Sequence, residues 1–136
     1  MDLKKIETLI KKYTGIPYKH GGRQLTGLDC LGLVHFFYQD CGIVFPDGDG
    51  GEYSVDWTKK DPLRYLRGIM AVGREVPVDQ LQPLDFVYFR MGRHITHGGI
   101  MVDEDRFLHV LQNSTVKVSR LDRIWRRRLA GARRLI

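Results

Sequence analysis

The residue best suited to nucleophilic chemistry is Cys30, which follows a glycine-rich loop and opens an apolar run. A cysteine thiolate is stabilised at the N-terminus of a helix, where free N–H groups and the helix dipole favour negative charge. The segment 30–40 is apolar and is followed by Gly42, so we expect a buried helix that begins at or just before Cys30. On this local evidence, a buried structural cysteine is an equally good interpretation.

Two histidines supply a candidate base and a residue to orient it. We expect His97 at the start of one strand and His109 within the next. If residues 103–105 form the loop between these strands, the two histidines share one face as diagonal neighbours, roughly 7–8 Å apart between Cα atoms. One imidazole can then orient the other, so Cys30, His97 and His109 are candidates for nucleophile, base and orienting residue. Asn113 is the next candidate for the orienting residue.

A zinc site is a competing use of Cys30, His94, His97 and His109. The spacing of His94 and His97 suits a helix better than the expected start of a strand. The sequence also lacks the Cys-x-x-Cys and His-Glu-x-x-His pairs that are typical of zinc sites. We therefore expect no metal and no other cofactor.

The elements that must position these residues indicate an α+β domain. Helical spacing predicts a helix over residues 3–13, with Asp2 as its cap, and another over 61–70, with Pro62 in its first turn. In the second half, short apolar runs between turn residues predict strands of an antiparallel sheet at 86–89, 99–102, 106–111, 115–118 and 128–136. Helices first and strands later predict one α+β domain over residues 1–136.

The overall composition sets limits on the class of protein. Of the 136 residues, 43% are apolar and 28% are charged, as in an ordinary globular domain. The net charge of +6 favours polyanions such as nucleic acid, anionic lipid or acidic wall polymers. Much of the excess lies at residues 126–128 and 133–134, and such clusters are more often a solvated face than a binding site. We expect no membrane span, since no run approaches ~20 apolar residues.

The two cysteines, Cys30 and Cys41, are expected near opposite ends of one helix. The rise of a helix then separates them by roughly 16 Å. A disulfide requires Cα atoms within about 7 Å of each other. We therefore expect two free thiols.

Together these residues resemble the NlpC-type cell-wall peptidases, which are papain-like cysteine endopeptidases that cut peptidoglycan stem peptides. The most specific part is the Asp-Cys-x-Gly-Leu-Val element at residues 29–34, accompanied by the later His-x-Gly-Ile element at 97–100. The resemblance covers nearly the whole chain in the family's order, at residues 15–22, 27–34, 42–46, 81–89, 97–100 and 107–110.

This resemblance implies a papain-like fold and a role for each site residue. Cys30 is the nucleophile, His97 the base and His109 the third polar residue. Tyr18 matches a tyrosine that lines the site and helps to bind the oxyanion, and Asp29 matches the acidic residue that holds the free amino group of the stem peptide. The implied reaction is hydrolysis of an amide bond through a thioester, commonly the D-glutamyl–diamino acid bond.

Three positions depart from the family pattern. Leu31 stands where serine is usual, His20 where an aromatic residue is usual, and Leu84 where glycine is usual. Leu31 removes a hydroxyl from the substrate side of the site, so the departure bears on which bond is cut more than on catalysis.

The start of the chain bears on delivery, because residues 1–6 lack the continuous apolar stretch of a secretory signal. This lack, together with that of anchoring repeats, resembles the phage-borne branch of the family, in which phage tail proteins are partners. The protein would then be made in the cytoplasm and reach the cell wall in a phage particle or after lysis.

Other classes of function stay open. One is a non-catalytic wall-binding or phage-tail structural module with the same fold, which the presence of Cys30, His97 and His109 argues against. Another is a nucleic-acid binder that uses the basic C-terminal segment; its binding would weaken steeply with salt and survive loss of Cys30. We expect a peptidoglycan peptide and not a nucleic acid as the partner. Acyl transfer through the same thioester is an alternative to hydrolysis.

Overall fold

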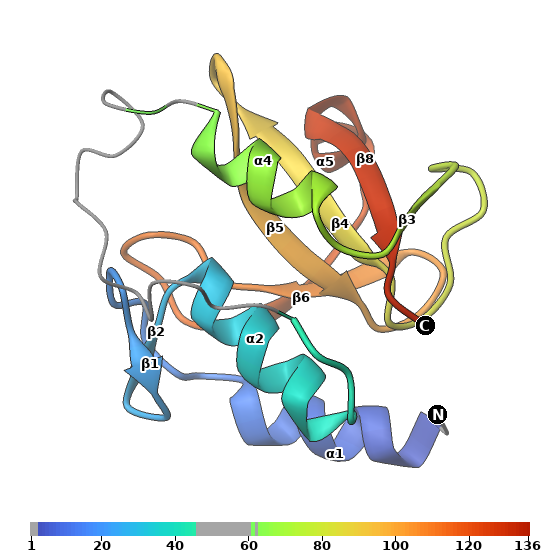
Figure 1. Ribbon diagram of the computed structural model, residues 1–136. Helices are drawn as coiled ribbons and strands as arrows, with labels where there is room; N and C mark the ends of the chain where they lie inside the picture. Colours follow the sequence, from blue (N-terminus) through green and yellow to red (C-terminus); the bar gives the residue numbers. More distant parts are fainter. Residues whose placement is uncertain (1–2, 46–60, 62) are drawn as a thin grey trace. The chain divides into compact units, whose positions relative to one another are not determined.

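The computed structural model describes residues 3–45, 61 and 63–136 (Figure 1). The chain divides into two compact units: unit 1 consists of residues 1–53 and 108–119, and unit 2 of residues 54–107 and 120–136. The cap expected at Asp2 and the first-turn position expected for Pro62 lie outside the described residues. The segment 46–51, whose glycine and aspartate residues predict a loop, also lies outside them. Helices and antiparallel strands together confirm the α+β class.

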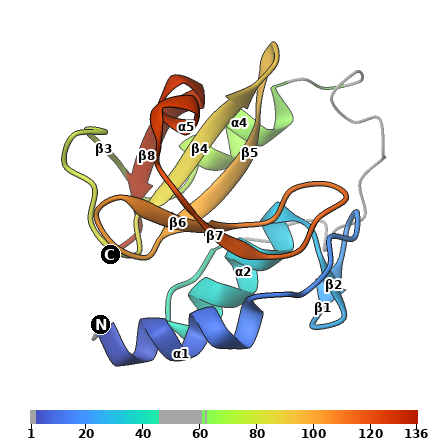
Figure 2. The same ribbon diagram turned by 180° about the vertical axis from the view of Figure 1, so that it is seen from behind.

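Two helices of unit 1 pack against each other. Helix α1 (Leu3–Tyr13) has the predicted bounds and buries the side chains of Ile6, Leu9 and Tyr13. The Tyr13 ring lies 5.8 Å from that of Phe37 in helix α2 (Cys30–Asp40). Figures 1 and 2 both show the two helices side by side. The apolar residues whose spacing predicted the helix therefore form the face that packs against α2.

Helix α2 begins and ends where the sequence predicts. Its N-cap is Asp29, whose side chain accepts a hydrogen bond from the backbone N–H of Gly32 at 2.9 Å. After the C-cap, Gly42 takes a φ of 74°, and the amides of Gly42 and Ile43 donate to carbonyls of the last turn. The two ends are thus stabilised by local interactions that the sequence already displays.

The rest of unit 1 brings distant parts of the chain together. Strands β1 (Arg23–Gln24) and β2 (Gly27–Leu28) form a small antiparallel hairpin directly before α2. The segment 15–18 hydrogen-bonds to the segment 114–116, which precedes strand β7 (Lys117–Arg120). These bonds attach residues 114–116 to the segment that leads to the β1–β2 hairpin and α2.

Unit 2 is built on an antiparallel sheet. Its strands lie in the order β3 (Arg74–Val76), β8 (Leu129–Arg134), β4 (Phe86–Met91) and β5 (His94–Met101). Strand β6 (Arg106–His109) begins in unit 2 and ends in unit 1. The buried core on one face of the sheet consists of Val76, Val87, Phe89, Met101, Phe107, Leu121 and Ala132.

Helices cover both faces of this sheet. In Figures 1 and 2, helix α4 (Arg64–Met70) lies on one face of β4 and β5, and helix α5 (Arg123–Arg128) lies on the other. Trp125 of α5 packs against the core with its ring 5.0 Å from that of Phe89. Of the described helices, none is long and apolar enough to cross a membrane.

Several element bounds differ from those expected. The helix expected over 61–70 begins only at Arg64, and the strand expected over 106–111 ends at His109. Three strands have other bounds than expected. The strand expected over 99–102 is β5 (His94–Met101), the one expected over 115–118 is β7 (Lys117–Arg120), and the one expected over 128–136 is β8 (Leu129–Arg134). Strand β5 starts earlier because a tight turn at Gly92 and Arg93 lets Met91 pair with His94.

Four elements, β1, β2, β3 and α5, were not predicted at all. The end of α5 is the basic run that we interpreted as a solvated charge cluster. Its start had a local signal, because the Asp122 side chain accepts from the Trp125 N–H at 3.0 Å as an N-cap.

Arg133 and Arg134, also in the basic C-terminal segment, are engaged within unit 2. Arg134 binds the buried carboxylate of Asp85 through two nitrogens, each at 2.8 Å. Arg133 donates to the carbonyls of Val72 and Gly73, just after α4. These two cations therefore connect β8 to the segment after α4 and to Asp85 before β4. Because their donors are used in this way, they contribute less than free surface arginines would to the binding of a polyanion.

Leu84 has an unusual backbone conformation, with a φ of 74°. It is the third residue of a turn closed by a hydrogen bond from Asp85 N to Gln82 O at 3.1 Å, with Pro83 before it. A type II turn needs a positive φ at this position, which glycine adopts without a steric penalty. This geometry explains why glycine is usual in the related family. The Leu84 side chain is 3% exposed, so burial offsets the strain.

We expect Leu84→Gly to be less destabilising than Leu84→Ala. Both variants lose a buried side chain, at a cost of about 2–5 kcal/mol. Only glycine also relieves the positive φ, which is worth about 1 kcal/mol. Urea unfolding of the three proteins measures the difference. If alanine is the better replacement, then the backbone conformation at Leu84 contributes no strain.

Candidate active site

Cys30 is the first residue of α2 and is half-buried in unit 1. The helix N-terminus lies against the preceding loop, since a Cβ atom at Gly32 would clash with the carbonyl oxygen of Gly22. This close approach explains the glycine of the Cys-x-Gly element. Neither Cys30 nor Cys41 forms a disulfide, as expected. Burial raises the pKa of the Cys41 thiol, which is the C-cap of the same helix.

Asp29 is almost fully buried, at 3% exposure, and its carboxylate binds several donors. Besides the Gly32 amide, one oxygen accepts from Arg23 Nη1 at 2.8 Å, and the other accepts from Gly21 N at 2.9 Å. The same Arg23 nitrogen donates to the Gly22 carbonyl at 2.8 Å. Asp29 therefore fixes the loop at residues 21–23 against the start of α2. Its expected role in holding an amino group stays a prediction.

Tyr18 lies near Cys30, the candidate nucleophile, within unit 1. Burial raises the pKa of Tyr18 to about 12, and the negative charges of Cys30 and Asp29 contribute in the same direction. Its backbone N–H donates to Ser114 O at 2.9 Å, which holds the segment in place. Because its hydroxyl stays protonated at neutral pH, Tyr18 is able to donate a hydrogen bond to an oxyanion.

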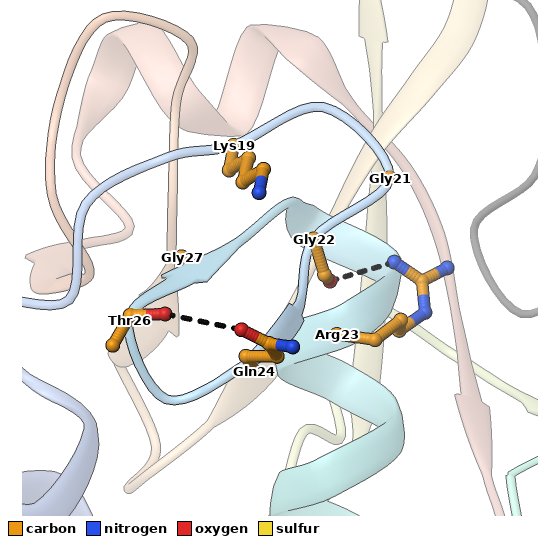
Figure 3. A pocket seen from close by; sticks show the side chains of 7 residues that line it. All are labelled: Lys19, Gly21, Gly22, Arg23, Gln24, Thr26 and Gly27. Carbon is orange, nitrogen blue, oxygen red and sulfur yellow. Dashed lines mark hydrogen bonds between the residues drawn. The ribbon is translucent and has the colours of Figure 1, made fainter.

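A pocket of about 250 Å³ lies between the loop at residues 19–22 and the β1–β2 hairpin (Figure 3). Figure 3 shows the Lys19 side chain extending over the hollow, with the Thr26 hydroxyl hydrogen-bonded to Gln24 on the hairpin. Lys19 brings a positive charge to the pocket, whereas the charge of Arg23 is paired with Asp29. Its lining consists of Lys19, Gly21, Gly22, Arg23, Gln24, Thr26 and Gly27.

His97 lies inside strand β5 of unit 2 and not at its start, and it is 5% exposed. Its ring centroid is 5.8 Å from that of Phe89, its partner on β4, and 5.7 Å from that of Trp125 on α5. On the other face of β5, a Cβ atom at Gly98 would clash with Tyr65 Oη. His97 therefore packs against aromatic rings on one face of β5, and Gly98 allows α4 to pack closely on the other face.

The surroundings of His97 disfavour its charged form. Burial lowers the pKa of His97 to about 4, and the positive charge of Arg128 contributes further. The Arg128 guanidinium carbon lies 5.1 Å from the centroid of the Trp125 ring. The imidazole is therefore neutral at pH 7, which is the form that accepts a proton.

His109 is the last residue of β6 and is completely buried. Its Nε2 atom lies 2.7 Å from the hydroxyl oxygen of Ser119, which is in β7. Asn113, the other candidate for the orienting residue, lies in an exposed turn beyond β6 with a φ of 62°. The buried position and the firm partner favour His109 over Asn113.

The structure brings Tyr18, Asp29 and Cys30 together in unit 1, which also contains His109. His97 belongs to unit 2, so its predicted approach to Cys30 and His109 stays a prediction. In the described part of the chain, no three His, Cys, Asp or Glu side chains are placed to hold a metal ion.

Four residues near the candidate site were not singled out from the sequence: Arg23, Ser119, Trp125 and Arg128. The cap at Asp122 could have predicted α5 and so directed attention to Trp125 and Arg128. No sequence signal distinguishes Ser119, because a serine in a short strand is ordinary.

Comparison with curated proteins finds relatives that are named as endopeptidases. The chain is 26% identical over 130 residues to the probable endopeptidase NlpC of Escherichia coli K12, covering 93% of this chain and 73% of that protein. It is 27% identical over 126 residues to the murein DD-endopeptidase MepS/murein LD-carboxypeptidase of the same organism. That match covers 91% of this chain and 58% of MepS.

Comparison with solved structures confirms the papain-like fold expected from the sequence. An NlpC/P60 family protein from Bacillus cereus superposes with a TM-score of 0.73 at 21% identity, covering 99% of this chain and 40% of that one. RipD of Mycobacterium tuberculosis, described as a non-catalytic NlpC/p60 domain protein adapted to peptidoglycan binding, superposes with a TM-score of 0.64 at 15% identity. The latter match covers 98% of this chain and 97% of RipD.

A sequence model of the NlpC/P60 family matches residues 15–134, which include Tyr18, Asp29, Cys30, His97 and His109. The match extends over both units and nearly the whole chain. The chain is a member of the NlpC/P60 family.

Proposed function

We propose that the protein is a cysteine endopeptidase that hydrolyses amide bonds in peptidoglycan stem peptides. The observation that carries this proposal is the position of Cys30 at the capped N-terminus of α2, close to the protonated hydroxyl of Tyr18. A thiolate is stabilised at this point of a helix. The name of the relative NlpC supports endopeptidase activity, and the name of MepS, a murein endopeptidase, supports the substrate class.

In the proposed reaction, the Cys30 thiol gives its proton to the neutral imidazole of His97 as the sulfur attacks the substrate carbonyl. The Cys30 backbone N–H and the Tyr18 hydroxyl donate to the oxyanion that forms. His97 then protonates the leaving amine, and the C–N bond breaks to leave a thioester on Cys30. His97 next takes a proton from water, whose oxygen displaces the thiolate and releases the carboxylic acid.

The bond we propose is the D-glutamyl–diamino acid bond, with Leu31 in place of serine as the feature most able to alter this choice. Delivery to the wall in a phage particle or after lysis, with phage tail proteins as partners, likewise stays a prediction. In acyl transfer, a molecule other than water accepts the acyl group from the thioester. The identity of the products therefore distinguishes acyl transfer from hydrolysis.

Digestion of purified peptidoglycan tests the proposal. We expect soluble fragments whose masses show a new carboxylate and a new amine at one stem-peptide bond, and no such fragments with Cys30→Ala. If the protein sediments with peptidoglycan but releases nothing, it is a wall-binding module, as RipD is described to be. Binding to nucleic acid that weakens with salt and is unaffected by Cys30→Ala would instead support the basic-segment alternative.

Asp29 gives a second prediction, which concerns the amino group of the substrate. If its carboxylate holds a free ammonium, stem peptides with an open N-terminus should be cut about tenfold faster than N-acetylated ones, since charge-assisted hydrogen bonds are among the strong ones. Asp29→Asn should erase this preference, because an amide carries no charge yet still caps α2. Cleavage rates of the peptide pair measure the effect.

Arg23→Gln is the matched control for this prediction. It removes the ion pair within the same loop but leaves the Asp29 carboxylate in place, so the preference for a free amine should persist. If Arg23→Gln and Asp29→Asn both lose the preference, the loop geometry matters and the carboxylate charge does not. If the parent protein cuts both peptides equally, Asp29 has only its structural role.

A further inference from the structure

Ser119 has a contact with the candidate site that neither the family resemblance nor the proposed mechanism uses. Its hydroxyl oxygen lies 2.7 Å from Nε2 of His109, and both residues belong to unit 1. His109 is completely buried, so its ring nitrogens must find partners inside the protein. One of these nitrogens is therefore committed to a single, well-defined hydroxyl.

We propose that Ser119 is a positioning residue, which holds His109 with the proton on Nε2 and the lone pair on Nδ1. The inference rests on the proposed function, in which His109 orients the base His97. A neutral base that accepts a proton through one ring nitrogen carries its own proton on the other. That N–H needs an acceptor, so His109 must offer a lone pair and not a second N–H.

The geometry at Ser119 meets this requirement in one way. If Nε2–H of His109 donates to the Ser119 oxygen, Nδ1 keeps its lone pair and can accept from His97. If the Ser119 hydroxyl donated to Nε2 instead, the proton would lie on Nδ1, and two N–H groups would oppose each other. The hydroxyl therefore acts as the acceptor, and its own hydrogen is directed elsewhere.

With the opposite tautomer, Ser119 would only satisfy the hydrogen-bonding needs of the buried His109 and would not position it for the reaction. A serine that only satisfies a buried histidine would accept or donate equally well, with no effect on the reaction. The proposal therefore stands or falls on which nitrogen of His109 carries the proton, a quantity that is measurable without any substrate.

Nitrogen-15 NMR of the ring nitrogens gives this readout, with His109→Gln used to identify the His109 signals. At neutral pH we expect a protonated Nε2 and an unprotonated Nδ1 in the parent protein. Ser119→Ala should give a mixture of the two tautomers or reverse them, whereas Ser119→Thr keeps the hydroxyl in a residue that suits a strand. A parent protein with the proton on Nδ1 overturns the proposal.

Kinetics then connect the tautomer to function. We expect Ser119→Ala to lower kcat about tenfold with little change in KM, as for loss of one supporting hydrogen bond, and Ser119→Thr to restore most of it. Unchanged kcat in Ser119→Ala, with an altered tautomer and intact fold, overturns the positioning role. Absence of hydrolysis in the parent protein would contradict the proposed function instead, while the tautomer still reports on Ser119.

Discussion

Replacing Cys30 with alanine is expected to abolish hydrolysis of peptidoglycan peptides while leaving the fold intact. The thioester cannot form without the sulfur, so activity should fall by at least about a thousandfold, as when other nucleophiles of this kind are removed. Cys30 opens α2 but does not cap it, and the capping carboxylate of Asp29 is unaffected. Release of amines from purified peptidoglycan measures activity, and circular dichroism checks the fold.

Cys41→Ala is the matched control, because it removes the other thiol at the opposite end of the same helix. Burial raises the pKa of Cys41, so this thiol is a poor nucleophile and its loss should leave activity nearly unchanged. Iodoacetamide should accordingly label Cys30 much faster than Cys41 at neutral pH. Equal labelling of the two cysteines, or hydrolysis that survives Cys30→Ala, would show that Cys30 is not the nucleophile.

The parts of the fold around Cys30 that the sequence predicted correctly are those stabilised by local interactions. Helix α2 starts at Cys30 because Asp29 caps it, and it ends before Gly42 because this residue takes a positive φ. Both signals lie within a few residues of the element that they bound. The position of Cys30, the candidate nucleophile, at a helix N-terminus was therefore predictable from a single stretch of sequence.

The parts that the sequence did not reveal depend on long-range packing. Trp125 and Arg128 affect His97 only because α5 folds onto the sheet beside β4 and β5, and a helix of 6 residues has little periodicity to detect. Ser119 meets His109 across neighbouring strands, which no local pattern encodes. Leu84 shows a related limit, since the residue type conflicts with the turn and only burial offsets the conflict.

The buried position of His97 predicts a loss of stability in acid. Its pKa is about 4 in the folded protein and 6.5 for an ordinary histidine. Above pH 6.5 the imidazole is neutral in both states and contributes no pH dependence. Between pH 6.5 and 4 the unfolded chain binds a proton that the folded protein does not, so the free energy of unfolding should fall by about 3 kcal/mol.

Comparison with His97→Gln isolates this contribution, because glutamine cannot be protonated and other groups titrate alike in both proteins. Urea unfolding between pH 7 and pH 4 should show the parent losing about 3 kcal/mol more than the variant. Arg128→Gln should narrow this difference, since the cation that helps to keep His97 neutral is gone. Parallel pH dependences for the parent and the His97→Gln variant would mean that the folded protein does not lower the pKa of this imidazole, and that burial does not keep His97 neutral.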